Sequence, residues 1–242
     1  MALSVETVEL DVTNNASVDT AFKVVSAKTG GKLDVLVNNA GLASAGIGET
    51  FTPEQLRGMF EVNVFGVQRM LRAALPDMRK NRSGLIINIG SIVGRLTIPF
   101  FALYGASKHA VEALTEGYRY EVSQFGVDVV LVQPGPFATN LYSALQVPAD
   151  AGRAASYGEV ANLPNKINTV LGGYFAQPET PQPHAVAEII AKLIDTPAGK
   201  RPERIVAGSA FGADIANEAL KPLQAQMVAG FGLTELGTLK AS

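Results

Sequence analysis

The sequence predicts an α/β fold in which a doubly wound parallel sheet carries helices on both faces. Three short, mostly apolar and largely β-branched runs, at residues 33–37, 85–89 and 127–132, lack a consistently polar face. Runs of this kind are typical of strands in a parallel sheet that is covered on both sides. Segments with helical periodicity separate them, and such alternation indicates βαβ units.

Composition narrows the class of protein. The chain has 242 residues, of which 47% are hydrophobic and 17% charged, which suits one large globular domain. A net charge of −2 provides no basic field for nucleic acid. The sequence has no cysteine, and His109 and His184 lack metal-binding spacing, so we expect neither disulfides nor a metal site. Without a long apolar run or a signal peptide, we expect no membrane span and a cytoplasmic location.

The helices are predicted from apolar spacing and from their end signals. The first carries apolar residues at i, i+3, i+4 and i+7 from Val18 and stops at Gly30-Gly31. The second begins at Thr52-Pro53, an N-cap residue followed by a proline suited to the first helical position. Alanines and Leu114 predict a third helix that ends near Gly126.

Weaker signals complete the domain. Residues 7–12 and 204–206 are candidate strands at the two ends of the sheet. Residues 137–183, rich in Gly, Pro and Ala, are interpreted as an insertion on the substrate side of the same domain. Residues 208–242 form the predicted tail, with a closing helix over 215–227. No repeat or linker divides the chain, so residues 1–242 form one domain.

Small and polar residues follow three of the predicted strands. The first clear strand ends in Asn38-Asn39-Ala40-Gly41, the second in Gly90-Ser91, and the third in a segment from Pro134 to Thr139. Ligands of an open parallel sheet bind beyond the carboxyl ends of its strands. These segments therefore mark the expected binding site.

Tyr104 and Lys108 carry the candidate chemistry. Residues four apart on a helix project from the same face. A phenol titrates near 10, and an ammonium group close to it favours the phenolate, so Lys108 could make Tyr104 a proton donor and acceptor near neutral pH. Such a pair often arises by chance. However, Tyr104 alone among the six tyrosines has a lysine at this spacing, and it follows the strand-end Ser91 by thirteen residues.

Taken together in their order and spacing, Asn38 to Gly41, Asn63, Ser91, the Tyr104/Lys108 pair and Pro134-Gly135 resemble the short-chain dehydrogenase/reductase family. The resemblance implies a Rossmann-like fold and NAD(P)-dependent hydride transfer between an alcohol and a ketone or aldehyde. It implies that Tyr104 is the general acid/base, Lys108 lowers its pKa and holds the nicotinamide ribose, Ser91 orients the substrate, and Asn63 completes a proton relay through water. The cofactor-binding positions that it implies are Asp11 near the adenine, Asn38, Ala40, Gly41, Tyr104, Lys108, Pro134, Gly135, Phe137 and Thr139.

One family feature has no counterpart in this sequence. The glycine-rich TGxxxGxG turn, which normally binds the cofactor's pyrophosphate, is absent from the 242 residues. The chain is therefore interpreted as N-terminally truncated relative to the family, and NAD and NADP both remain open as cofactors. Because the family's first strand would be missing, we predict that residues 7–12 take the vacated position and pair in parallel with 33–37.

Two functions remain open from the sequence. The first is an oxidoreductase acting on a small, largely apolar carbonyl or alcohol, since apolar residues flank the expected site at Phe100, Phe101, Phe137, Leu141 and Tyr142. The second is a catalytically impaired, truncated subunit or fragment that acts through assembly. The resemblance also implies a homodimer or homotetramer, paired through the helices around Asn63 and Tyr104.

Overall fold

A four-stranded parallel sheet forms the centre of the computed structural model, which describes residues 5–240. The strands lie in the order β1 (Val35–Asn38), β2 (Gly84–Ile89), β3 (Val127–Pro134) and β4 (Arg204–Ala207). In register, Leu36 is paired with Ile86, and Ile86 with Val129. The three apolar runs and the segment 204–206 are thus confirmed as strands, with ends shifted by one or two residues.

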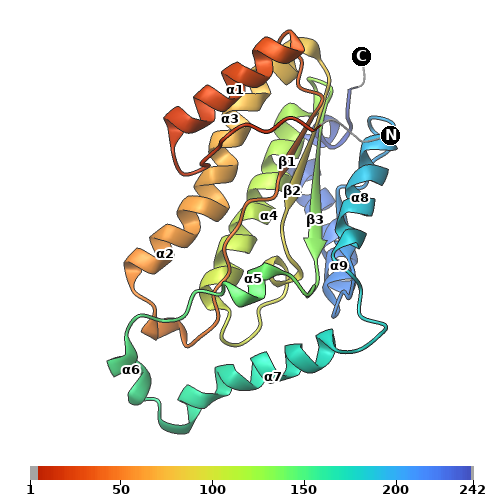
Figure 1. Ribbon diagram of the computed structural model, residues 1–242. Coiled ribbons are helices and arrows are strands. Elements are labelled where there is room, and N and C mark those ends of the chain that lie inside the picture. Colours follow the sequence, from red (N-terminus) through yellow and green to blue (C-terminus); the bar gives the residue numbers. More distant parts are fainter. Residues whose placement is uncertain (1–4, 241–242) are drawn as a thin grey trace.

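Helices cover both faces of the sheet, as Figure 1 shows. On one side lie α3 (Val67–Asn81) and α4 (Ala102–Ser123), and on the other lies α8 (His184–Asp195). The segment after β3 passes across the end of the sheet toward which the β3 arrow points. The remaining helices are α1 (Asn15–Thr29), α2 (Pro53–Phe60), α5 (Asn140–Ser143), α6 (Ala151–Ala155), α7 (Leu163–Phe175) and α9 (Ala213–Gly230), and the last confirms the predicted closing helix.

The expected helix ends are present at α1 and α2. Asn14 caps α1 by accepting hydrogen bonds from the backbone N–H groups of Ala16 and Ser17. Gly30 ends it in the left-handed conformation, at φ 64°. Thr52 and Gln55 form a reciprocal capping box at the start of α2, which satisfies two backbone N–H groups that the helix itself leaves unpaired.

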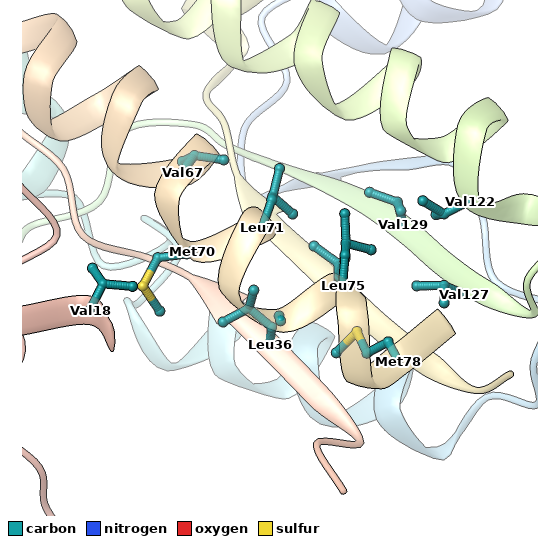
Figure 2. Packing of buried hydrophobic residues seen from close by; sticks show 12 residues of the cluster. Val18, Leu36, Val67, Met70, Leu71, Leu75, Met78, Val122, Val127 and Val129 are labelled. Atoms are coloured by element: carbon teal, nitrogen blue, oxygen red, sulfur yellow. The ribbon is translucent and has the colours of Figure 1, made fainter. Parts of the chain in front are cut away.

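Two apolar layers hold the helices to the sheet. On the α3 side, Leu36, Ile86 and Val129 pack against a group of fully or nearly buried residues that includes Leu71 and Met78 (Figure 2). On the other side, the alternate strand positions, among them Ile87, Val130 and Val132, pack against α8. Both faces of the central strands are therefore buried, which accounts for their largely apolar sequence.

The prediction of a strand at residues 7–12 is wrong. This segment is irregular, and β1 has only β2 as a strand neighbour among residues 5–240. The Asp11 N–H bonds the Ser17 hydroxyl at 2.9 Å, and the Val12 carbonyl accepts from Arg69 at 3.2 Å. Val12 also packs directly over Gly66. The segment is held by α1 and α3 instead of the sheet, because side chains there satisfy backbone groups that a strand would offer to a neighbour.

Gly126 connects α4 to β3 in a conformation that requires glycine. Its φ is +72°, and a Cβ there would lie 2.3 Å from the Arg82 carbonyl oxygen. We expect Gly126→Ala to lower the free energy of unfolding by about 2–4 kcal/mol, from left-handed strain and overpacking. Gly117→Ala is the matched control, because Gly117 lies inside α4 with nothing within 4 Å, and should stabilise by roughly 0.5–1 kcal/mol. Urea unfolding of both variants measures the difference, and equal stabilities would contradict the expected clash.

No helix within residues 5–240 combines the length and the apolar composition needed to cross a bilayer.

Candidate active site

Ser91, Tyr104 and Lys108 meet at the carboxyl end of the sheet. Ser91 follows β2, and its hydroxyl accepts a hydrogen bond from the Val93 N–H. Tyr104 and Lys108 lie in the first two turns of α4, on the face turned toward that strand end. All three side chains are buried, with at most 9% of each residue exposed. The expected three-residue constellation is therefore assembled in the fold.

Lys108 is held at the end of β2 by a single backbone contact. Its Nζ donates to the Ile89 carbonyl at 2.9 Å and lies 5.8 Å from the centre of the Tyr104 ring. Since an ammonium group has three N–H donors, two remain for other acceptors. Burial lowers the pKa of Lys108 from 10.5 to about 8, because the charged form loses its hydration.

Tyr104 differs in one respect from the expectation. Burial raises the pKa of its phenol above the ordinary value, and a hydrogen bond with Ser91 offsets part of this rise. Desolvation therefore outweighs any stabilisation of the phenolate by Lys108 in this structure. The phenol is therefore protonated at neutral pH.

Asn63 lies in a short π-helical segment, Glu61–Gly66, between α2 and α3. Its amide nitrogen donates to the Leu42 carbonyl and to the Ser107 hydroxyl, both at 2.9 Å. Its amide oxygen accepts from the Leu42 N–H at 2.8 Å. Ser107 in turn donates to the Tyr104 carbonyl. Asn63 thus ties the chain after β1 to the helix that carries Tyr104, and π-bulges of this kind are frequent at functional sites.

Asn38 belongs to a buried polar chain beneath the site. Its amide donates to Asn88 at 2.8 Å, Asn88 donates to Thr115 at 2.9 Å, and Thr115 donates to the Val111 carbonyl. These bonds join β1, β2 and α4. The Asn38 side chain is therefore occupied within the protein, and its structural role does not require a ligand.

Five of the other expected cofactor positions lie at the ends of β1 and β3 or in the segments that follow them. Ala40 and Thr139 are exposed at strand ends, and the Gly41 backbone faces Lys108, whose Nζ is 3.7 Å from an ideal Cβ position. Gly135 fits against β4 so closely that a Cβ would stand 2.3 Å from the Ser209 carbonyl oxygen, and Pro134 precedes it at the end of β3.

Phe137 and Asp11 make contacts with other parts of the structure. Phe137 is buried in the apolar layer on the α8 side, directly beneath Gly208. Asp11 accepts hydrogen bonds from the backbone and hydroxyl of Thr13, and these bonds lower the pKa of its carboxyl. Its contacts connect it to the start of α1.

An apolar cover surrounds Tyr104. Phe101 meets its ring edge to face at 6.4 Å between centroids. Leu141, Leu145 and Ile167, from the segment 137–183, pack into the same cluster. Burial, together with the nearby Tyr104, raises the pKa of Tyr142. The cover therefore comes largely from the segment that the sequence interpretation placed on the substrate side.

Three contributors were missed from the sequence. Ser107 lies within the Tyr104–Lys108 segment, yet its role depends on Asn63, which is 44 residues away. Tyr174 and Phe175 of α7 also join the cover: Phe175 packs on Tyr142 at 5.1 Å between centroids, and the Tyr174 hydroxyl bonds Ser209 at 2.8 Å. The aromatic residues within 137–183 are the sequence feature that could have identified Tyr174 and Phe175.

Comparison with known proteins identifies relatives over most of the chain. A family described as short chain dehydrogenase matches residues 2–148. A 3-ketodihydrosphingosine reductase of Bacteroides thetaiotaomicron is 41% identical over 150 residues, covering 62% of this chain and 55% of that protein. The chain thus spans about half the length of the curated relatives it matches, such as this reductase and an uncharacterized oxidoreductase of Bacillus subtilis.

Solved structures agree with the sequence comparison. A short-chain dehydrogenase from Streptomyces avermitilis is 32% identical, with a TM-score of 0.73 over 95% of this chain and 80% of that one. An alcohol dehydrogenase from Thermococcus sibiricus, complexed with 5-hydroxy-NADP, is 25% identical, with a TM-score of 0.65 over 84% of this chain and 73% of that one.

Proposed function

The chain belongs to the short-chain dehydrogenase family, and on that premise we propose that it is an NAD(P)-dependent oxidoreductase that interconverts an alcohol and a ketone or aldehyde. The observation that carries this proposal is the buried group of Ser91, Tyr104 and Lys108 at the carboxyl end of the sheet. A proton donor, a second hydroxyl and a cation placed together can bind a carbonyl oxygen, protonate it and stabilise the charge that develops.

The residues present fit the nicotinamide end of the cofactor. Lys108 retains two N–H donors that can bind ribose hydroxyls, and the neighbouring Gly41 adds no side chain to obstruct them. Ala40 and Thr139 are exposed in the segments that follow β1 and β3. Solved relatives are complexed with 5-hydroxy-NADP, with NADP+ and with NADH, so either nicotinamide cofactor remains open. When bound, the cofactor supplies or accepts the hydride.

Tyr104 and Ser91 act on the substrate oxygen in this proposal. Burial keeps the Tyr104 phenol protonated, because it raises the pKa of that group. The phenol can then donate its proton to a carbonyl oxygen during reduction, while the Ser91 hydroxyl donates a hydrogen bond to the same atom. Lys108 supports the developing phenolate.

Asn63 acts as a positioning residue in our proposal. Its side chain already makes three hydrogen bonds to Leu42 and Ser107, so both of its N–H donors are in use and one oxygen lone pair is left for the water relay that the family resemblance implies. By joining the loop after β1 to α4, it sets the distance between Gly41 and Lys108. That distance determines where the ribose can lie.

The substrate in this proposal is a carbonyl compound with an apolar body. Leu141, Leu145 and Ile167 pack around Tyr104, and a pocket bounded by such side chains binds hydrocarbon by the hydrophobic effect. A relative at 41% identity is named a reductase of 3-ketodihydrosphingosine, which supports a long apolar substrate. We also propose a homodimer or homotetramer that pairs α3 and α4, supported by the half-exposed Phe65 in the π-helical segment that precedes α3.

Two measurements on the full chain test the proposal. NADPH and NADH are first titrated by nicotinamide fluorescence, and micromolar saturation by at least one of them is expected. Reduction of a series of methyl ketones of increasing chain length then follows. Because each buried CH₂ contributes about 0.8 kcal/mol, kcat/KM should rise about fourfold per added CH₂ until the pocket is filled. Absence of cofactor binding contradicts the oxidoreductase, whereas turnover that is independent of chain length contradicts only the apolar substrate.

A further inference from the structure

A closed ring of four polar side chains lies next to the candidate active site, and the proposed function does not use it. Its members are Arg95, Glu112, Gln133 and Asn217. The last three are buried, and the Arg95 side chain is 15% exposed. They come from the turn after β2, from α4, from β3 and from α9. The ring therefore joins the turn that begins at Ser91 to the helix that carries the proposed acid.

Each contact in the ring pairs a donor with an acceptor. Arg95 makes an ion pair with Glu112 at 2.7 Å and donates through Nε to the side-chain oxygen of Asn217 at 3.1 Å. Asn217 donates to Gln133 at 2.7 Å, and Gln133 donates to the other carboxylate oxygen of Glu112. Within the ring Arg95 only donates, Glu112 only accepts, and each of the two amides does both.

This pattern requires a carboxylate at position 112. An amide has an acceptor at one end and a donor at the other, whereas Glu112 receives donors at both ends. If an amide replaced it, one donor would face another donor somewhere in the ring. Turning over the amides of Gln133 and Asn217 would move this conflict but would not remove it, because Arg95 has only donors to offer.

Stability alone does not account for such a ring. Burial raises the pKa of Glu112, and its bonds to Gln133 and the arginines offset part of this rise, so the carboxylate is held in an environment that disfavours its charge. Replacement of a buried ion pair by apolar residues is often neutral or stabilising. The geometry that the ring fixes is therefore the better explanation for its presence.

The ring fixes the turn after β2 against α4. Ser91 caps a 3₁₀ turn that ends at Arg95, and Glu112 follows Lys108 by one turn on α4. Between them, Gly94 lies so close to α4 that a Cβ would stand 2.9 Å from the Lys108 carbonyl oxygen and 3.1 Å from Glu112 Oε1. The Arg95–Glu112 ion pair holds this close contact together.

We propose that Glu112 is a positioning residue that sets the distance between the Ser91 and Tyr104 hydroxyls by holding Arg95 against α4. This inference rests on the proposed function, in which both hydroxyls bind the same carbonyl oxygen. A displacement of about 1 Å can lower the rate of a catalysed step by about hundredfold. In this role Glu112 contacts neither substrate nor cofactor, and it acts through the position of Ser91.

Ketone reduction by Glu112→Gln tests the proposal. The variant keeps the size of the side chain but breaks the ring, so kcat should fall by about 10- to 100-fold. The Kd of NADPH in the fluorescence titration should stay nearly unchanged, because Lys108 remains on α4. Glu116→Gln is the matched control. It removes a charge from the same arginine, yet Glu116 lies outside the ring, and a glutamine oxygen can still accept from Arg95. Its kcat should match that of the wild type.

A Ser91→Ala background separates positioning from a general structural defect. Once the Ser91 hydroxyl is gone, its position no longer matters, so the addition of Glu112→Gln should lower kcat further by less than about twofold. Circular dichroism shows whether each variant is folded. If Glu112→Gln does not fold, Arg95→Lys replaces it: lysine keeps the charge but lacks the planar fork that bonds two partners, and the same dependence on Ser91 is expected.

Three results would overturn the proposal. They are a wild-type kcat in Glu112→Gln, an equal loss in Glu116→Gln, and losses that multiply in the Ser91→Ala background. A wild type that reduces no ketone would instead contradict the proposed function. The role of Glu112 would then fall with it, because no carbonyl oxygen would need the two hydroxyls to be aligned.

Discussion

Replacing Tyr104 by phenylalanine is expected to lower kcat/KM for ketone reduction by about 10²–10⁴-fold, the usual contribution of a positioned general acid. The variant removes only the hydroxyl, and the buried ring keeps its packing against Phe101. Nicotinamide binding should therefore stay nearly unchanged in the fluorescence titration. Steady-state kinetics with a long-chain methyl ketone measure the loss, and it should appear in kcat.

The matched control for this variant is Tyr142→Phe. Tyr142 belongs to the same cover, where the nearby Tyr104 helps to raise the pKa of Tyr142, and burial raises the pKa of both phenols. Its hydroxyl has no role in the proposed proton transfer, so the control should retain most of the wild-type kcat. Wild-type turnover by Tyr104→Phe would show that Tyr104 is not the general acid. Equal losses in the two variants would indicate that both substitutions disturb the packing of the cover.

The sequence predicted the sheet well because its strands are buried on both faces. The run 127–132 is apolar except at Asp128, because α4 and α8 cover its two sides, and the buried Asp128 carboxylate is paired with Arg119 and Arg201. The ends of α1 and α2 were equally readable, since caps depend on residues within one turn. At these places the local sequence largely determines the secondary structure.

What could not be predicted depends on distant partners. The alternating residues 7–12 suit a strand, but Ser17 and Arg69 bond their backbone in the folded chain. The family resemblance implied a cofactor contact for Asn38, but the sequence did not reveal that its amide bonds Asn88, 50 residues away. Whether a polar side chain at a strand end turns toward a ligand or toward the interior depends on which partners the tertiary fold brings to it.

Lys108 shows the same limit in its electrostatics, and here the consequence can be measured. Four-residue spacing predicted a cation beside Tyr104, which the structure contains, but spacing does not reveal how completely that cation is buried. Its pKa of about 8 in the folded protein lies well below the 10.5 of an exposed lysine. The charged form is thus disfavoured by folding, and function at neutral pH opposes stability at this position.

Lys108→Met is expected to remove a rise in stability that the wild type shows between pH 8 and 10.5. In this window the unfolded wild-type chain binds a proton that the folded chain has released, so its free energy of unfolding increases with pH, by about 3 kcal/mol in total. Below pH 8 both states bind the proton and the contribution of Lys108 is constant. Methionine has no proton to release, so the difference between the two proteins should grow by that amount across the window.

Urea unfolding at several pH values measures this difference, and other titrating groups cancel because both proteins contain them. At pH 7 the variant escapes the cost of burying a charge but leaves the Ile89 carbonyl without its donor, a loss of about 1–3 kcal/mol. The two stabilities should therefore be similar there, although the variant has lost the cation that supports Tyr104. Lys32→Met, at an exposed lysine, controls for the removal of one charge. Parallel curves for wild type and Lys108→Met between pH 8 and 10.5 would show that folding does not bury a charged lysine, and the proposed electrostatic support of Tyr104 would then have no basis.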